Sequence, residues 1–224
     1  MTTESLSIQG FACVAGVLLP EECKRLAAHL DTAASALAGT RQLLSHAWCR
    51  ALAKRLRTHP QLTGTVPVDD VAVQCTYFSK SVNKNWLVPV HQDLSIPVAE
   101  KVEAPGFHAW SIKEGGVFVQ PPTSLLERLV AVRVHLDPCA ESDGPLQVVP
   151  GSHLQGALAP ARAHAVRDQS GTVTCALGIG DALVMRPLLL HASSKAGGAS
   201  ARRVLHFLFA PRELPHGLRW PHAI

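Results

Sequence analysis

The sequence predicts a mainly β protein in which N-terminal helices pack on a β-sandwich or barrel. After Val66, short apolar or alternating segments are separated by glycines and prolines, which is typical of antiparallel β proteins. Before Val66, apolar residues recur at helical spacing. The chain has 224 residues, of which 47% are hydrophobic, and this length suits one domain with a sizeable core. We therefore expect a single domain over residues 1–224, with helical support at 1–65 and a β core at 66–210.

Two helices are expected in the N-terminal part of the chain. Residues 10–19 are apolar and end at Pro20, so they predict a short strand and a turn. Pro20 and the two glutamates after it suit a first helical turn, and Gly39 marks the expected end of this helix. A second helix is expected over residues 43–58, where it ends just before a proline.

The β core is expected to consist of short strands and one long interruption. The strands fall within 71–78, 87–96, 128–136, 146–150, 172–178, 181–192 and 202–210. Residues 97–127 contain paired glycines and prolines, so we expect a long loop there without regular strand pairing. Such a loop in a compact domain is often functional. Trp110 and Lys113 within it predict a mobile lid that faces substrate, and the alternative is a fixed loop pinned by one buried aromatic.

Composition argues against several classes of function. The net charge is +4, and the basic residues are scattered rather than gathered into a nucleic-acid-binding stripe. The six cysteines form no CxxC pair, which indicates reduced thiols rather than disulfides or a zinc site. The N-terminus lacks a signal-type apolar run, and no apolar stretch approaches the ~20 residues of a membrane span. We expect a cytoplasmic protein that binds neither nucleic acid nor membrane, and the sequence carries no signal for an oligomeric state.

A His-x-Asp pair followed by a later histidine is the pattern that carries chemistry in this sequence. Two histidines and one carboxylate on one face of a metal leave three positions open, which suits non-haem Fe(II). Residues i and i+2 of a strand point the same way, so one strand supplies two ligands. Chance alone predicts roughly one His-x-acid match in such a chain, so context must decide. The matches are His29-x-Asp31, His91-x-Asp93 and His135-x-Asp137.

These pairs differ in their context. The first lies on a predicted helix, where positions i and i+2 diverge. The second lies in an apolar strand upstream of several histidines, and the third ends a strand directly before Pro138 and stays an alternative. Pattern alone does not choose the third ligand. The candidates are His153, His164, His191 and His206.

Four segments of the chain follow one another in the order found in a single enzyme family. They are His91-Gln92-Asp93; Asp143-Gly144-Pro145 with Pro150-Gly151-Ser152-His153; Leu190-His191-Ala192-Ser193; and Arg202, 11 positions after His191. In this order they resemble the phytanoyl-CoA dioxygenase family of Fe(II)/2-oxoglutarate-dependent oxygenases. The resemblance extends from about residue 10 to residue 210.

The resemblance implies a fold, a reaction and a set of metal ligands. The fold is a double-stranded β-helix of the jelly-roll or cupin-like kind. The ligands of Fe(II) are His91, Asp93 and His191. The co-substrates are 2-oxoglutarate and O₂, and the enzyme hydroxylates or otherwise oxidises a small molecule while 2-oxoglutarate is decarboxylated to succinate.

The resemblance also implies co-substrate contacts. Arg202 matches the arginine that holds the distal carboxylate of 2-oxoglutarate, a geometry that suits its planar fork. Strand alternation does not favour this choice, because the face that carries Arg203 is the more apolar one. Ser193 matches a small hydroxyl residue that contacts co-substrate in relatives. Gln74 and Lys80, on the strand before the metal strand, are further candidates, with ordinary β-face residues as the alternative.

Arg133 departs from the family pattern, because some relatives carry a tryptophan at its position. A charged residue within an apolar strand needs a buried partner or a pocket. We therefore expect Arg133, together with Trp110 and Lys113, to contact substrate. Two other functions stay open: a cupin-like metal enzyme that does not use 2-oxoglutarate, and a metabolite sensor on the same barrel. Arg202 argues against the cupin-like enzyme, a sensor would show no substrate-linked turnover, and co-substrate consumption discriminates among the three.

Overall fold

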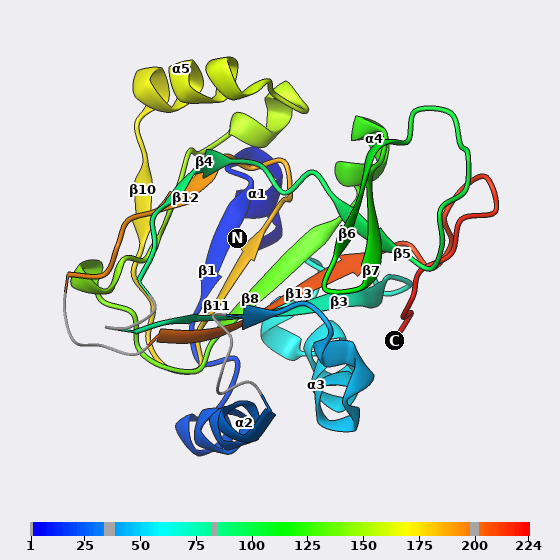
Figure 1. Cartoon of the computed structure of the whole chain (residues 1–224). Coiled ribbons are helices and arrows are strands. Elements are labelled where there is room, and N and C mark those ends of the chain that lie inside the picture. Colours follow the sequence, from blue (N-terminus) through cyan, green and yellow to red (C-terminus); the bar gives the residue numbers. More distant parts are fainter. Residues whose placement is uncertain (1, 34–38, 82–84, 198–201) are drawn as a thin grey trace.

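The computed structural model describes residues 2–33, 39–81, 85–197 and 202–224. Two antiparallel sheets face each other, and a third, smaller sheet lies beside them (Figure 1). The prediction of a mainly β fold is confirmed, and the facing pair of sheets forms a double-stranded β-helix.

The strands are assigned to three sheets, which we call the major, minor and insert sheets. The major sheet contains, in spatial order, β1 (Phe11–Val14), β11 (Ala182–Met185), β8 (Val130–His135), β13 (Arg202–Ala210), β3 (Val71–Lys80) and β2 (Gly39–Thr40). The minor sheet contains β10 (Val173–Cys175), β9 (Leu146–Val148), β12 (His191–Ser193) and β4 (Val88–His91). The insert sheet contains β5 (Ile96–Val98), β7 (Gly116–Gln120) and β6 (His108–Lys113).

The helices lie around these sheets. They are α1 (Thr2–Ile8), α2 (Pro20–Ala33), α3 (Ala47–Arg57), α4 (Thr123–Leu126) and α5 (Pro160–Ser170). α2 begins at Pro20 as predicted, whereas its expected approach to Gly39 passes through residues outside the described part of the chain. The helix expected over 43–58 is a 3-10 turn followed by α3.

Neither α1 nor α5 was expected from the sequence. Leu6 is the buried residue of α1, and α5 buries only Ala163 and Val166 among its described side chains. Neither helix therefore has the broad apolar stripe that makes a helix visible in a sequence. Pro160 at the start of α5 and Gly171 after its end were the available signals.

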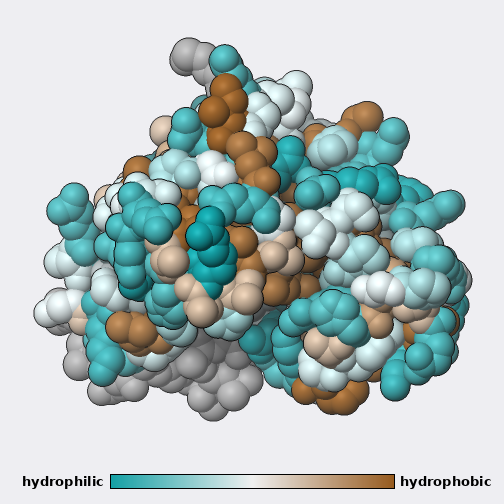
Figure 2. Space-filling view, turned by 90° about the horizontal axis from the view of Figure 1, so that it is seen from above, coloured by the Kyte–Doolittle hydropathy of each residue, from teal (hydrophilic) through white to brown (hydrophobic). Residues whose placement is uncertain are grey.

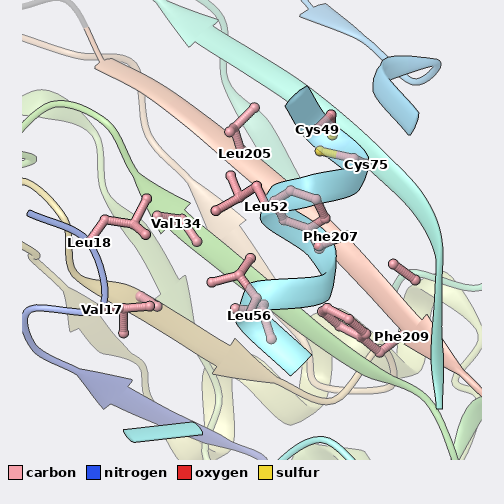
Figure 3. Close-up of a cluster of buried hydrophobic side chains, with 14 of the residues drawn as sticks. Val17, Leu18, Cys49, Leu52, Leu56, Cys75, Val134, Leu205, Phe207 and Phe209 are labelled. Atoms are coloured by element: carbon pink, nitrogen blue, oxygen red, sulfur yellow. The ribbon is translucent and has the colours of Figure 1, made fainter. Parts of the chain in front are cut away.

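The outer face of the major sheet is covered by α2 and α3. Figure 3 shows Leu52 and Leu56 of α3 beside Phe207 of β13. Phe207 and Leu205 are fully buried in this cluster. Full burial of each such side chain stabilises the fold by about 1.5–3 kcal/mol. The apolar face of β13 is thus a packing surface for helices.

The inner face of the major sheet turns toward the minor sheet and encloses a cavity. β13 lies between β8 and β3, and its register places Arg202 opposite Lys80 and His206 opposite Arg133. Directly opposite residues on one face of a sheet have their Cβ atoms about 4.5–5.5 Å apart. All four side chains line the same cavity.

The prediction of an irregular loop over residues 97–127 is wrong, because most of this segment belongs to the insert sheet and α4. Gly106 and Gly115 both adopt a φ of 78°, at turns between strands, and Pro121 and Pro122 follow the end of β7. The turn-forming residues therefore separate strands that pair with one another, rather than preventing pairing.

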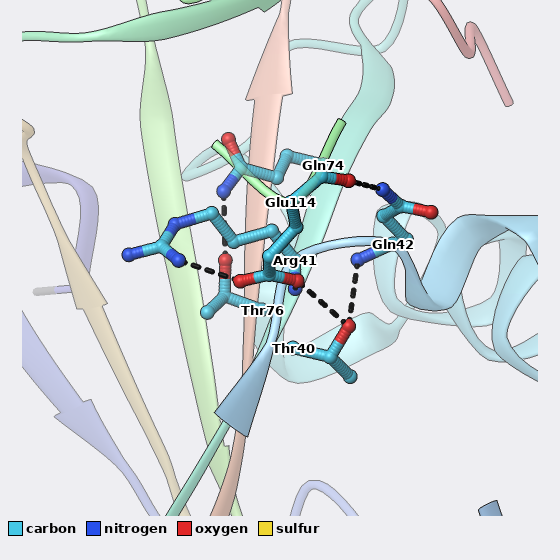
Figure 4. Close-up of polar contacts among 6 residues, drawn as sticks. All are labelled: Thr40, Arg41, Gln42, Gln74, Thr76 and Glu114. Carbon is cyan, nitrogen blue, oxygen red and sulfur yellow. Dashed lines mark hydrogen bonds and ion pairs between the residues drawn. The ribbon is translucent and has the colours of Figure 1, made fainter. Parts of the chain in front are cut away.

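The tip of the β6–β7 hairpin is tied to residues 40–42, and we call these contacts the hairpin latch (Figure 4). The Glu114 carboxylate accepts hydrogen bonds from Thr40 Oγ1 at 3.0 Å, Arg41 N at 2.8 Å and an Arg41 guanidinium nitrogen at 2.6 Å. Gln42 Nε2 donates to the Glu114 carbonyl. A lid formed by this hairpin must break these contacts in order to open.

The surface mixes hydrophobic and hydrophilic side chains. On the face seen in Figure 2, hydrophobic residues form separate patches among hydrophilic ones. The exposed large hydrophobic residues include Leu19, Val68, Ile112 and Leu154. Within the ranges that the structure describes, no helix combines the length and the apolar character needed to cross a membrane.

Candidate metal centre

His91, Asp93 and His191 meet in the cavity between the major and minor sheets. β4 pairs with β12 so that His91 lies opposite His191, and the two ring centroids are 4.2 Å apart. Asp93 lies just beyond the end of β4, and its carboxylate is 3.9 Å from His91 Nε2 and 3.8 Å from His191 Nε2. Among the described residues, these three form the one group of His, Cys, Asp or Glu side chains whose ligand atoms all lie within 4.8 Å of one another.

Backbone carbonyls orient both imidazole rings. His91 Nδ1 lies 2.9 Å from the Pro89 carbonyl oxygen, and His191 Nδ1 lies 2.9 Å from the Leu189 carbonyl oxygen. A carbonyl oxygen only accepts hydrogen bonds, so in each neutral ring Nδ1 carries the proton and Nε2 keeps a lone pair. Both lone pairs are then available to a metal near the Asp93 carboxylate, which is the usual arrangement of metal-binding histidines.

Gln92, between the two outer residues of the His-Gln-Asp segment, fixes the segment in place. Its Nε2 donates to the Gly156 carbonyl at 2.8 Å and the Leu188 carbonyl at 2.6 Å, and its Oε1 accepts from Leu158 N at 2.8 Å. Gln92 is buried and joins the segment to the chain before α5 and before β12. From the sequence Gln92 was visible only as part of the His-Gln-Asp segment, and its supporting role was not predicted.

The surroundings of the site favour an ionised Asp93 and neutral His191 and His206. Desolvation by the surrounding protein raises the pKa of Asp93, but His191, His206, His91 and Arg133 outweigh it and hold the pKa below the ordinary value of 3.8. Burial lowers the pKa of His191, and it lowers the pKa of His206 to about 4. Ionised carboxylate and neutral imidazole are the forms that bind metals.

His206 is a further imidazole at this site. Its Nε2 lies 3.8 Å from Asp93 Oδ2, and its ring lines the cavity. From the sequence, His206 was only one of four candidates for the third ligand. The ligand atoms of His91, Asp93 and His191 all lie within 4.8 Å of one another, and the nitrogens of His206 do not meet this criterion. His191 is therefore the histidine that completes the group with His91 and Asp93.

Two buried cations, Arg202 and Lys80, lie farther along the same cavity. Arg202 is 3% exposed and Lys80 is 1% exposed. The Arg202 guanidinium donates to the Gly144 carbonyl, and Lys80 Nζ donates to Ser193 Oγ at 2.9 Å and to the Ser194 carbonyl at 2.6 Å. Within the described ranges, neither cation forms an ion pair with a carboxylate. Their arrangement suits an anionic ligand.

The contact between Arg202 and residue 144 is linked to the glycine at that position. Gly144 adopts a φ of +63°, and a Cβ there would lie 2.5 Å from the Ser194 carbonyl oxygen. Glycine at this turn therefore lets the Gly144 carbonyl approach Arg202.

Burial, followed by the positive charges of Arg202 and Arg133, lowers the pKa of Lys80 to about 8, so the amine stays mainly protonated at neutral pH.

The structure also shows which face of β13 carries which arginine. Arg203 forms a bidentate pair with Asp137, with Arg203 Nε 2.9 Å from Asp137 Oδ2 and Nη2 2.9 Å from Oδ1. Arg202 instead lines the cavity. The pair His135-x-Asp137 thus does not form a metal site, since Asp137 is occupied by Arg203. In the pair His29-x-Asp31, the His29 ring stacks on Trp48 with centroids 5.7 Å apart.

The remaining predicted contact residues divide into two groups. Gln74 lines the cavity, where its Nε2 donates to Thr76 Oγ1 at 2.7 Å (Figure 4). Arg133 and Lys113 also line it. Trp110 does not line it; its partly buried ring packs against the hydrophobic cluster that includes Phe107 and Val119, and Lys101 Nζ lies 5.9 Å from its ring centroid. The prediction that Trp110 faces substrate has no support in this geometry.

The cavity has a volume of about 290 Å³ and contains aromatic side chains that the sequence analysis did not single out. They are Phe78, Trp86 and Phe118. Phe78 has the same parity along β3 as Gln74, Thr76 and Lys80, so strand alternation was a signal for it. Phe118 lies in the segment expected to be a loop, where no alternation was sought.

Comparison with known proteins adds independent information. A search of the solved structures finds the carbocyclase SnoK from nogalamycin biosynthesis, described as non-heme and alpha-ketoglutarate-dependent, with a TM-score of 0.67 and 14% identity, covering 95% of this chain and 83% of that chain. EctD from S. alaskensis, solved with 2-oxoglutarate and 5-hydroxyectoine, has a TM-score of 0.69 and 16% identity, covering 93% and 74%. AviO1 from Streptomyces viridochromogenes Tue57 has a TM-score of 0.62 and 20% identity, covering 100% and 96%. At these identities, the likeness establishes the fold.

Sequence comparison identifies the family. No curated protein matches the chain. The family model described as phytanoyl-CoA dioxygenase (PhyH) matches residues 7–204, which is most of the chain. This range includes all four segments on which the resemblance was based. The chain therefore belongs to the phytanoyl-CoA dioxygenase family.

Proposed function

We propose that His91, Asp93 and His191 bind one Fe(II) and that the neighbouring cations bind 2-oxoglutarate. The chain is an Fe(II)/2-oxoglutarate-dependent oxygenase that oxidises a small molecule, in keeping with its family. The donor set supports the metal assignment, because two neutral imidazole nitrogens and one ionised carboxylate suit Fe(II) and leave coordination positions open. When bound, the iron supplies the centre at which O₂ is reduced while 2-oxoglutarate is decarboxylated to succinate.

Arg202 is proposed to hold the distal carboxylate of 2-oxoglutarate. Its planar guanidinium has a buried Nε without a hydrogen-bond partner among the described residues. Lys80 adds a second positive charge, and Ser193 is already oriented by its bond to Lys80 Nζ. Charge-assisted hydrogen bonds of this kind are about twice as strong as neutral ones. Gln74, on the same wall, is a further proposed contact.

The side chains around the centre orient the reactants and limit the access of water. Backbone carbonyls and Gln92 hold the ligands in place, so the site is organised before a metal arrives. Apolar side chains also line the cavity, among them Leu94, Leu129 and Met185. Such a lining holds an apolar substrate near the centre and keeps the oxidation away from bulk solvent.

One observation carries the proposal: a triad of metal-ligand side chains opens into the same cavity as two buried cations that have no acidic partner in the described chain. A metal sensor or a cupin-like enzyme without 2-oxoglutarate needs the triad but not Arg202 and Lys80. The cations therefore favour the oxygenase.

The test begins with anaerobic titration of the purified protein with Fe(II), followed by 2-oxoglutarate. We expect about one Fe(II) per chain, and His91→Ala or His191→Ala should abolish this binding. His135→Ala is the matched control, because His135 is buried outside the metal group. Loss of metal in His135→Ala with normal binding in His91→Ala would reject the assignment. Iron binding without 2-oxoglutarate binding would favour the sensor or the cupin-like enzyme.

A further inference from the structure

Arg133 is the cavity residue whose charge the proposed function does not use. It is 6% exposed and comes from the centre of β8, where the family pattern allows an uncharged tryptophan. Its Nε has no hydrogen-bond partner in the described part of the chain. Its guanidinium carbon lies 5.2 Å from the ring centroid of Phe78, and no ion pair with a carboxylate is formed within the described ranges. A buried cation without an acidic partner is costly unless a ligand supplies the opposite charge.

Arg133 is close enough to both ends of the proposed co-substrate site to interact electrostatically with Asp93 and with Arg202. It is the cross-strand neighbour of His206, beside the metal centre. Burial and the positive charge of Arg202 lower the pKa of Arg133 to about 9, while Asp93 acts in the opposite direction. Arg133 therefore interacts electrostatically with groups at both ends of the site, and its guanidinium stays charged at neutral pH.

The cavity as a whole carries more positive charge than the co-substrate requires. Among its described lining residues, Asp93 is the only carboxylate. The cationic lining residues are Arg41, Lys80, Lys113, Arg133 and Arg202. In the proposed function, one carboxylate of 2-oxoglutarate lies at the metal and the other at Arg202 and Lys80. Both charges of the co-substrate are then matched without Arg133.

A second unused cation lies on the insert sheet. Lys113 lines the cavity with its Nζ 5.0 Å from the ring centroid of Phe118. Burial and the positive charge of Arg41 lower the pKa of Lys113. Arg41 itself is neutralised by Glu114 in the hairpin latch, whereas Lys113 has no carboxylate within ion-pair distance in the described chain. Two walls of the cavity thus each supply one cation that lacks an acidic partner.

We propose that the molecule oxidised by this enzyme is an anion with an apolar body, whose carboxylate or phosphate group is held by Arg133, with Lys113 of the insert sheet as a second positive charge. This inference rests on the proposed function, because it assigns 2-oxoglutarate to Arg202 and Lys80. The apolar lining suits the body of such a substrate, and the cavity volume of about 290 Å³, shared with the co-substrate, limits it to a small molecule.

The experiment uses matched probes with and without a charge. Hexanoate is compared with hexanamide, and hexyl phosphate with hexanol, by titration into the anaerobic Fe(II)- and 2-oxoglutarate-loaded protein while its visible absorption is followed. We expect each anion to bind at least about tenfold more tightly than its neutral counterpart, and Arg133→Met to remove most of this preference. Arg133→Lys should restore part of it. Arg203→Met, on the outer face, should keep the preference for anions that the unmodified protein shows.

Two further readouts separate substrate binding from other roles of Arg133. The dissociation constant of 2-oxoglutarate in Arg133→Met should stay within about threefold of its original value. The melting temperature of the ligand-free Arg133→Met protein should not fall, because the variant removes a buried charge that has no acidic partner. A clear fall would indicate a structural role and overturn the proposal.

The remaining outcomes are also decisive. Equal binding of anions and neutral probes, or no binding of either anion, would overturn the proposal. An Arg133→Met variant that weakens 2-oxoglutarate binding while keeping the preference for anions would assign Arg133 to the co-substrate instead. Failure of the unmodified Fe(II) protein to bind 2-oxoglutarate would reject the proposed function itself, which is a distinguishable result.

Discussion

The two faces of strand β13 differ in how their charges are satisfied. On the outer face, Arg203 is paired with Asp137 through two 2.9 Å contacts, and Phe207 is fully buried against the helices. On the inner face, Arg202 and His206 point into a cavity in which Asp93 is the only carboxylate among the described lining residues. Neighbouring residues of one strand thus belong to two environments.

This difference separates structural residues from residues that await a ligand. A buried charge that finds its partner within the chain contributes to the fold, whereas a buried charge without one lowers stability until a ligand binds. Variants on the outer face should therefore change stability with little effect on affinity. Variants on the inner face should do the reverse.

The largest effect is expected on the outer face. Phe207→Ala removes a fully buried ring from the cluster between β13 and α3, and it should lower the unfolding free energy by about 3–5 kcal/mol. Urea denaturation measures this loss. The fraction that remains folded should bind 2-oxoglutarate with nearly unchanged affinity. A large loss of affinity in the folded fraction would show that the two faces are coupled.

The next effect is expected on the inner face. Arg202→Met should raise the dissociation constant of 2-oxoglutarate by roughly 30-fold or more, since loss of one member of a buried charge pair costs about 2–5 kcal/mol. The ligand-free variant should unfold at the same or a higher urea concentration, because a buried guanidinium without an acidic partner has been removed. Anaerobic titration and denaturation together test this prediction.

Arg203→Met is the matched control for Arg202→Met. It breaks a partly buried bidentate pair and should cost about 1–3 kcal/mol of stability, with 2-oxoglutarate affinity unchanged. If Arg203→Met damages 2-oxoglutarate binding and Arg202→Met does not, the assignment of the two faces to structure and ligand is wrong.

A smaller effect is expected from pH. The pKa of Lys80 is lowered from 10.5 to about 8, so this amine loses its proton as the pH rises above about 8. The dissociation constant of 2-oxoglutarate should then rise by up to about tenfold between pH 7 and pH 9.5, and Lys80→Met should lack this dependence. A wild-type affinity that stays constant over this range would remove Lys80 from the co-substrate site.

The same shift has a consequence for stability that can be measured without ligand. Between pH 8 and 10.5 the unfolded chain holds more protons at Lys80 than the folded chain does, so this group's contribution to the unfolding free energy rises with pH. Lys80→Met should therefore stabilise the ligand-free protein more at pH 7 than at pH 10. The melting temperatures of both proteins at the two pH values provide the measurement.

Much of the fold could be predicted because its signals are local. Strands such as β3, β8 and β13 are rich in apolar β-branched and aromatic residues, and α2 begins with Pro20 and two glutamates. The pair His91 and Asp93 could be proposed because the two residues lie two positions apart in an apolar strand, whereas His191 was chosen among four histidines only through the resemblance to the family. The strand patterns, the helix start and the His-x-Asp spacing can all be recognised within a short stretch of sequence.

The rest of the fold depends on contacts that the sequence does not display. The strands of the insert sheet are short and interrupted, and their pairing becomes clear only in three dimensions. Both faces of β13 are covered, so the more apolar face could not reveal whether Arg202 or Arg203 enters the cavity. The role of Gln92 likewise depends on carbonyls more than 60 positions away.

The position of β13 also constrains how the protein forms during synthesis. β13 lies between β8 and β3, and it pairs residue 202 with residue 80. Until residues 202–210 leave the ribosome, β8 and β3 each have an unpaired edge, and the sheet exists as two separate groups of strands. Such edges favour association between chains, and closure over a large sequence separation is slow. The nascent chain is therefore most exposed to misassembly just before the strand that carries Arg202 is added, and a chaperone that covers these edges would raise the yield of folded enzyme.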